Sequence, residues 1–476
     1  MKGPRHSAFT QSSRWSRPRM LDREVRFSWP AGVAFAALCF LLSYPGRLNG
    51  DSLFSLMATT KPGLTNNWHS ATLQWLWSLP GPVLGQPAGA LAIQAVLFGI
   101  FAGFLPRLPR DLRGRAALAG EVLLRVALAG ATGYIGKDAV ILTALLIAVQ
   151  VLRRLSQARL GAGGSVLLGL VTALFLLTKA PNFLVVVVAL ALVLPFFIQS
   201  RRAYLALIAI ALVVGALAVP LNRAVDSVIF KARDLHPDKQ LVLFDVAGIS
   251  ARTGQNLFAD VPGWPTTALK PPAACYVPYM WDSFAEWAPC GGYATAYDRF
   301  DGALKRRWVE AIAAHPIAYA QHRLLYIDYL LESRDHATWG LDGQSINDAS
   351  NAKAMDEMRR GIAAVKPNRP IALWHPSFAT EPMRWLERAL FKFPKVQWVG
   401  LIICLAVLLF GWTRRHDGIR LGAILAAALG LGNFAMLAVF GVADPARYMV
   451  PTVGLAYLAL LALLAPPLVG NRFERR

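Results

Sequence analysis

Long apolar runs separated by short polar stretches dominate the pattern of this chain. The runs approach the length of about 20 residues that crosses about 30 Å of hydrocarbon. The pattern therefore predicts an all-α membrane protein with about ten transmembrane helices. The runs 138–152 and 163–178 are short for a full crossing, and losing both would leave the others in the same orientation. To within a few residues, we place the runs at 27–44, 83–105, 116–135, 138–152, 163–178, 182–198, 203–223, 397–413, 420–441 and 448–467.

Two longer polar regions interrupt the runs. The first, 45–82, follows the first run, and the second, 224–396, has an ordinary soluble composition and enough length for a small core. We predict that the second region is an extracytoplasmic mixed or all-α domain between the seventh and eighth transmembrane helices. The predicted organisation is a basic N-terminus, a transmembrane region, the outer domain, C-terminal transmembrane helices and a tail, at 1–26, 27–223, 224–396, 397–467 and 468–476.

Three stretches of the outer domain carry local signals. "LVLFDVAGIS" (241–250) is predicted as a strand followed by a turn, and 298–323 as helix with a break at Pro316. The run 315–331 is apolar, but Gln321, His322 and Arg323 at its centre make a membrane crossing expensive. We expect this run to pack at the membrane surface or within the outer domain.

Basic residues set the orientation of the predicted helices, because cytoplasmic loops are enriched in Lys and Arg. The loops on one side hold the N-terminal cluster, Arg107 to Arg115, Arg153, Arg154, Arg201, Arg202, Arg414, Arg415 and the tail "NRFERR". The short loops on the other side hold only Arg47, Lys61, Lys137, Lys179 and Arg447. This asymmetry predicts that both termini are cytoplasmic.

Composition agrees with a membrane protein. The chain of 476 residues is 55% hydrophobic and 16% charged, whereas soluble domains carry about 25% charged residues. The net charge of +21 lies in clusters between apolar runs rather than on a basic face with aromatics, so we exclude a nucleic-acid partner. We find no P-loop, no Gly-x-Ser-x-Gly elbow and no His/Cys cluster with metal spacing. Cys275 and Cys290 lie in the outer domain, where a disulfide is permitted but not required.

Polar groups near the outer ends of the runs are candidate functional residues, since ionisable groups at membrane depth are costly unless they are used. Each has a structural alternative. Asp51 suits a helix cap as well as a catalytic base, and the apolar stripe that follows it suits an interfacial helix of Leu53, Phe54, Leu56 and Met57. The other structural alternatives are helix capping and snorkelling for Lys137 and Asp138, a turn for Lys179 near Asn182, an ion pair of Arg447 with Asp444, and an aromatic belt for His69.

The stretches "YPG…GDS…WHS", "GKDAVILTALL", "TKAPNFLVVVVAL" and "DPARYMVP" resemble a bacterial branch of the C-type (GT-C) superfamily of polytopic membrane glycosyltransferases. The resemblance covers most of the runs. Better-studied members usually show an acidic pair in the first outer loop, whereas Asp51 is followed here by Ser52. A lone carboxylate makes a poor divalent site, so we expect no metal and no other cofactor.

The resemblance implies transfer of a sugar from a polyprenyl-phosphate carrier to an acceptor outside a bacterial inner membrane, with inversion at the anomeric carbon. Asp51 would be the general base. Substrate-binding roles would fall to His69, Lys137, Asp138, Lys179, Asn182 and Arg447, with the cations facing the leaving phosphate.

Two rivals from other functional classes remain open, a transporter or flippase and a non-catalytic scaffold, and a glycan polymerase or ligase is a nearer alternative. A scaffold would need neither Asp51 nor the outer lysines and would tolerate alanine at both. A transporter or flippase would carry ionisable groups in mid-span and internal symmetry, whereas we place the charges of this chain at the ends of its runs. A glycan polymerase or ligase would use the same carrier at the same face of the membrane.

Overall fold

The structure is a computed structural model. It describes residues 25–48, 50–60, 63–106, 111–155, 162–198, 200–286, 288–332, 395–414, 420–443 and 448–465, with short pieces between 360 and 393. The described residues are helical almost throughout, which confirms the all-α prediction. Two three-residue strands, β1 (Val25–Phe27) and β2 (Phe104–Pro106), pair antiparallel; β1 precedes the helix Trp29–Ser43, and β2 follows the helix Ala88–Ala102.

Each apolar run is a helix. Three of these helices are long and apolar enough to cross a membrane: Arg201–Ile229, Val396–Thr413 and Leu421–Phe440. The others are shorter or carry charged residues within them or at their ends, so the number of crossings remains a prediction. In chain order the helices are α1 (Trp29–Ser43), α5 (Ala88–Ala102), α6 (Leu112–Thr132), α7 (Lys137–Leu155), α8 (Ala162–Thr178), α9 (Phe183–Val193), α10 (Arg201–Ala224), α18 (Val396–Thr413), α19 (Leu421–Phe440) and α21 (Val450–Leu464).

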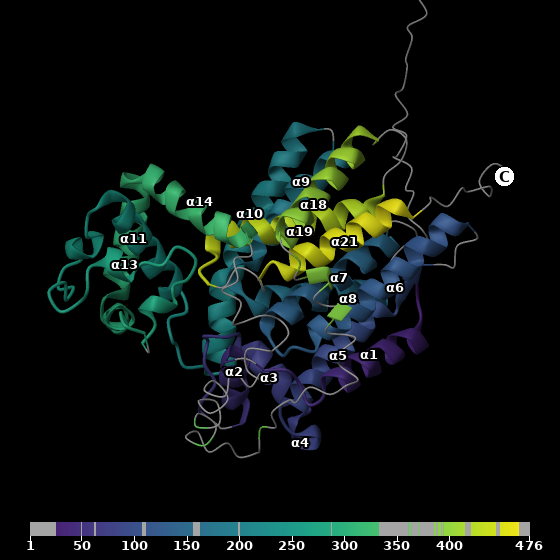
Figure 1. Ribbon diagram of the computed structural model, residues 1–476, viewed down its shortest axis with the longest axis horizontal. Helices are drawn as coiled ribbons and strands as arrows, with labels where there is room; N and C mark the ends of the chain where they lie inside the picture. Colours follow the sequence, from purple (N-terminus) through teal and green to yellow (C-terminus); the bar gives the residue numbers. More distant parts are fainter. Residues whose placement is uncertain are drawn as a thin grey trace, which may run out of the picture.

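Helix α7 lies at the centre of the bundle that these helices form (Figure 1). Nearly every side chain between Ala139 and Val151 is buried, against α5, α6, α8, α19 and α21. Such all-round burial is typical of an apolar helix without a polar face. Both ends of α7 are charged, so the helix brings a polar group to each end of the bundle.

Helix α11 (Lys239–Thr253) corrects the predicted strand at 241–250. Its side chains from Val242 to Ser250 are buried on every face, so the residues show no helical polar–apolar period. A short apolar run of this kind does not distinguish a strand from a buried helix. Gly254, at φ 70°, ends the helix in the left-handed conformation.

The region predicted as the outer domain, which keeps that name below, packs around α11, with α12 (Pro272–Cys275), α13 (Gly292–Ala314) and α14 (Pro316–Glu332), to one side of the bundle (Figure 1). The chain leaves helical geometry at His315, so the predicted break before Pro316 is confirmed. Helix α14 contacts α11 and α13, and also α18 and α19. It therefore belongs to the outer domain and rests against the bundle, which agrees with the expectation for 315–331.

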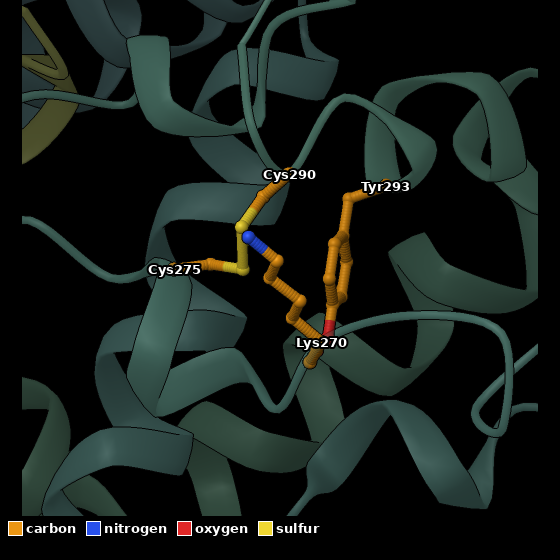
Figure 2. The surroundings of a disulfide bond; sticks show 4 residues. All are labelled: Lys270, Cys275, Cys290 and Tyr293. Atoms are coloured by element: carbon orange, nitrogen blue, oxygen red, sulfur yellow. A yellow bond between two sulfur atoms is a disulfide. The ribbon is translucent and has the colours of Figure 1, made fainter.

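A disulfide joins Cys275 and Cys290, whose Cα atoms are 6.0 Å apart. Tyr293 and Lys270 lie beside it, and the Tyr293 hydroxyl donates to the Lys270 carbonyl at 2.7 Å (Figure 2). The sequence left open whether Cys275 and Cys290 pair, and the structure shows that they do. The bond closes the loop between α12 and α13.

Three consecutive residues after α19 connect the outer domain to the bundle. Arg323 donates to the Gly441 carbonyl at 2.7 Å. The Trp281 backbone N–H donates to the Val442 carbonyl at 2.8 Å, and the Tyr326 hydroxyl donates to that of Ala443 at 3.2 Å.

The first polar loop contains α2 (Gly50–Thr60), α3 (Ala71–Ser78) and α4 (Gly81–Leu84). Leu53 and Leu56 are buried in a core beside α3 and α5, while Phe54 is partly exposed. The sequence suggested that α2 presents one apolar stripe at an interface. Instead, the helix packs into the protein with Leu53 and Leu56. Asp51 lies within its first turn and does not precede it as a cap.

Candidate functional site

A small pocket, partly open to solvent, lies where α2, the turn before α3 and the start of α7 meet. Four of the seven site residues predicted from the sequence line it: Asp51, His69, Lys137 and Asp138. They come from three separate stretches of the chain. The other lining residues are Ser52, Ser55, Leu73, Trp77, Tyr134 and Gly136.

Asp51 is the exposed acid of the pocket, at 43% exposure, in the first turn of α2. A carboxylate is favoured there by the partial positive charge of a helix N-terminus. The Ser55 hydroxyl donates to the Asp51 carbonyl at 2.9 Å, and the Ser52 hydroxyl donates to the Ile135 carbonyl. The Ser52 contact attaches the start of α2 to the segment that leads into α7.

His69 lies beside Asp51 and is only 6% exposed. Its Nε2 is 4.0 Å from Asp51 Oδ1, and its Nδ1 is 3.4 Å from the Nζ atom of Lys137. The Gln74 side chain fixes this stretch of backbone, because its amide donates to the carbonyls of Asn66 and His69 at 2.9 and 2.8 Å. Ser70, the next residue, caps α3 by accepting from Leu73 N–H.

The turn between α6 and α7 places Lys137 and Asp138 in the pocket. Gln94 of α5 donates to the carbonyls of Thr132 and Tyr134, both at 2.8 Å, and accepts from Gly136 N–H at 3.3 Å. A single buried amide therefore holds the backbone on both sides of the turn.

Arg47 connects this turn to the first loop. Its backbone N–H donates to Gly133 at 3.2 Å, and its carbonyl accepts from Ile135 N–H at 2.9 Å. Its guanidinium also donates to the Gly130 carbonyl. The first loop therefore reaches α7 through main-chain pairing rather than through side chains alone.

Three predicted site residues do not line the pocket. Lys179 lies over the Tyr448 ring, with its Nζ atom 5.0 Å from the ring centroid. Asn182 is fully buried and donates to the Phe175 carbonyl at 2.7 Å, so it stabilises the connection between α8 and α9. Arg447 lies outside the described residues.

Sequence reasoning missed the residues that build the pocket without supplying charge. Gln94 and Gln74 are both about 1% exposed. The signal for Gln94 was present, since a lone amide inside an apolar run has to find hydrogen-bond partners. Tyr134 and Trp77 had no comparable signal, because an aromatic residue near a run end equally suits the membrane interface.

The pocket combines the Asp51 carboxylate, the Lys137 ammonium and the His69 ring, with His69 lying between the other two. Asp51 can accept a proton, and Lys137 can neutralise a developing negative charge. Among the residues that the structure describes, no group of three or more His, Cys, Asp or Glu side chains could hold a metal ion.

A second charged cluster lies at the other end of α7 and corrects the expectation that charges occur only at the ends of runs. Glu121, inside α6, is 3.2 Å from Arg125 and 3.9 Å from Arg153, and all three side chains are at most 2% exposed. Arg125 also donates to the Phe104 carbonyl at 2.9 Å. At about 1.5 Å per residue, this cluster is about 24 Å along α7 from Lys137.

Comparisons with protein-family models, with curated proteins and with solved structures found no match to this chain. The arrangement of the described residues therefore carries the functional argument.

Proposed function

We propose that this chain is an integral membrane glycosyltransferase. It moves a sugar from a polyprenyl-phosphate carrier to an acceptor outside a bacterial inner membrane, where the acceptor is an envelope glycan, a lipid or a protein. The observation that carries the proposal is the convergence of Asp51, His69, Lys137 and Asp138 in one pocket. If each of these residues had only a separate structural role, the three distant stretches of chain that carry them would not need to meet in one pocket.

The reaction is a single displacement with inversion at the anomeric carbon. Asp51 removes the proton of the acceptor hydroxyl as its oxygen forms a bond to that carbon. The bond from the carbon to the phosphate oxygen breaks, and its electron pair remains on the phosphate. Lys137, at the mouth of the α7 turn, neutralises the charge that develops on that oxygen.

The proposed placement in the membrane has ten crossings and both termini in the cytoplasm. The pocket and the outer domain then lie on the outer face, and the Glu121 cluster lies near the cytoplasmic face. Helix α10 exposes large apolar side chains along its length, including Leu205, Ile210 and Leu217, which suits contact with lipid. The outer domain, close to the first loop, would select the acceptor.

The test is a mass-spectrometric comparison of cell envelopes from wild-type, deletion and Asp51→Asn strains at equal membrane abundance. We expect the deletion and Asp51→Asn to lose the same sugar-sized modification. The matched control is Asp260→Asn, the same chemical change at an exposed position of the outer domain, and it should retain the modification. If Asp51→Asn retains it while the deletion loses it, Asp51 is not the base.

The Glu121 cluster favours a second candidate, a transporter or flippase of a lipid-linked glycan. Buried ionisable groups within a helical bundle are typical of transport pathways. On that alternative, the Glu121→Gln strain loses the envelope modification, whereas the Asp51→Asn strain retains it. The transferase proposal expects the Asp51→Asn strain to lose the modification, whatever the result for Glu121→Gln.

A further inference from the structure

His69 lies between the two charged side chains of the pocket, with one ring nitrogen turned to each. Nδ1 is 3.4 Å from Lys137 Nζ, and Nε2 is 4.0 Å from Asp51 Oδ1. The ring is almost fully buried and also packs edge-on against Phe54, with the ring centroids 6.2 Å apart. It therefore has a defined orientation in the pocket.

The chemistry of the lysine assigns the proton on this ring. A lysine ammonium carries three donors and no acceptor, so the nitrogen that it contacts must accept. In a neutral imidazole, one nitrogen accepts and the other carries the proton. With Nδ1 accepting from Lys137, the proton is on Nε2, the nitrogen that faces Asp51.

The backbone on each side holds this arrangement in place. Gln74 fixes the carbonyl of His69, and Gln94 fixes the turn that ends at Lys137. Ser52 attaches α2, with Asp51, to the same turn. The three side chains are thus presented by three elements joined through buried hydrogen bonds.

We propose that His69 is a positioning residue for Asp51, and that Lys137 sets its tautomer. The Nε2–H of His69 faces Oδ1 of Asp51 at 4.0 Å, a separation longer than a hydrogen bond, and orients the carboxylate by charge–dipole attraction as it accepts the proton of the acceptor hydroxyl. This inference rests on the proposed function, because it gives Asp51 the role of base. Lys137 acts on both sides: it orients the base through His69 and faces the departing phosphate.

The first test reads the tautomer directly. The full chain, labelled with ¹⁵N-histidine and embedded in lipid bilayers, is studied by solid-state NMR, and the His69 signals are identified by their loss in His69→Gln. In the wild type we expect Nε2 in the protonated range and Nδ1 in the acceptor range. Lys137→Arg should preserve this pattern, because arginine also only donates. Lys137→Met should lose it. A proton on Nδ1 in the wild type, or an unchanged pattern in Lys137→Met, overturns the inference.

The second test measures envelope modification at equal membrane abundance. His69→Leu removes the donor, and a misplaced base costs on the order of 100-fold in rate. His69→Gln, whose side-chain amide can still donate, should recover part of that loss. Equal activity of His69→Leu and the wild type would overturn the positioning role.

The two tests separate the inference from the function on which it rests. If the tautomer is as expected but Asp51→Asn leaves the modification unchanged, the proposed function fails, and the positioning role fails with it. If Asp51→Asn abolishes the modification while the tautomer is reversed, the function stands and the inference alone is overturned.

Discussion

Asp245, on α11, lies in a cluster of buried polar contacts in the outer domain. Its carboxylate is fully buried and accepts from Trp308 at 2.9 Å, while Arg323 and His322 lie at 2.5 and 3.0 Å. The other nitrogen of His322 is 2.7 Å from the Tyr276 hydroxyl, beside the disulfide. Removing either Asp245 or Arg323 leaves the charge of the other buried and uncompensated, which costs about 3–5 kcal/mol.

This group predicts a pH dependence of stability. Burial lowers the pKa of His322 below its usual value of 6.5, even though Asp245 opposes the shift, and Arg323 lowers it further. The folded protein therefore holds His322 neutral while the unfolded chain binds a proton. Stability is complete above about pH 6.5 and falls as the pH decreases from there, by at most about 1.4 kcal/mol per pH unit for one proton.

The measurement is the Tm of the purified chain in detergent between pH 7.5 and 5.5. The wild type should lose Tm on acidification, and His322→Gln should have a lower Tm at pH 7.5 but a flatter profile. His236→Gln, a change at a partly exposed histidine of the same region, should keep the wild-type slope. Parallel slopes in all three proteins would show that His322 does not titrate in this range.

Single residues also show what the sequence could predict of the site. Asp51, Lys137 and Asp138 were found because a charge beside an apolar run is unusual, and the pocket brings them together. The position of a polar side chain beside an apolar run also selected Asn182, whose side chain makes a local hydrogen bond in the structure. Charge and position identify candidates, but the partner of each side chain depends on the packing of helices distant in sequence.

At the level of helices, α1 and α5 pack closely through small residues. Gly32 and Ala36 on α1 meet Gly99 on α5, a spacing of small residues that lets membrane helices approach closely. A Cβ atom on Gly99 would lie 2.6 Å from the Gly32 carbonyl oxygen and 2.8 Å from Ala36 Cβ. Neither atom can move away without separating the two helices.

We therefore predict that Gly99→Ala destabilises the protein by about 1–3 kcal/mol, the range for overpacking. Gly169→Ala on α8 is the matched control, because nothing lies within 4 Å of its Cβ position. Thermal unfolding in detergent measures both variants. Since α1 leads into the loop that carries Asp51, Gly99→Ala should also lower envelope modification. Equal Tm values for the two variants would show that α1 and α5 adjust freely.

The helices themselves were predicted unevenly, for a physical reason. All ten apolar runs are helices, because their length and hydrophobicity exceed what a buried strand needs. Residues 241–250 were assigned to a strand because α11 is buried on every face and shows no period. The α6–α7 turn that shapes the pocket was beyond sequence reasoning, because Gln94 and Arg47 hold it from other elements.

For the whole molecule, the decisive question is which parts lie on each side of the membrane. The clustering of arginines and the Cys275–Cys290 disulfide are independent indications that agree. Arginine-rich loops favour the cytoplasm, and disulfides form and persist in oxidising compartments outside it. Both favour the proposed orientation, in which the outer domain and the pocket joined to it by the first loop lie on the outer face.

Labelling of introduced cysteines tests this orientation. The free cysteines Cys39 and Cys404 are buried and the other two are paired, so the native chain supplies little background. Gly302→Cys, on an open surface of α13, should react with a membrane-impermeant maleimide while the inner membrane is intact. Arg202→Cys, at the start of α10, should react only after that membrane is opened. The reverse pattern would place Asp51 in the cytoplasm, where a carrier-linked sugar on the outer face could not reach it.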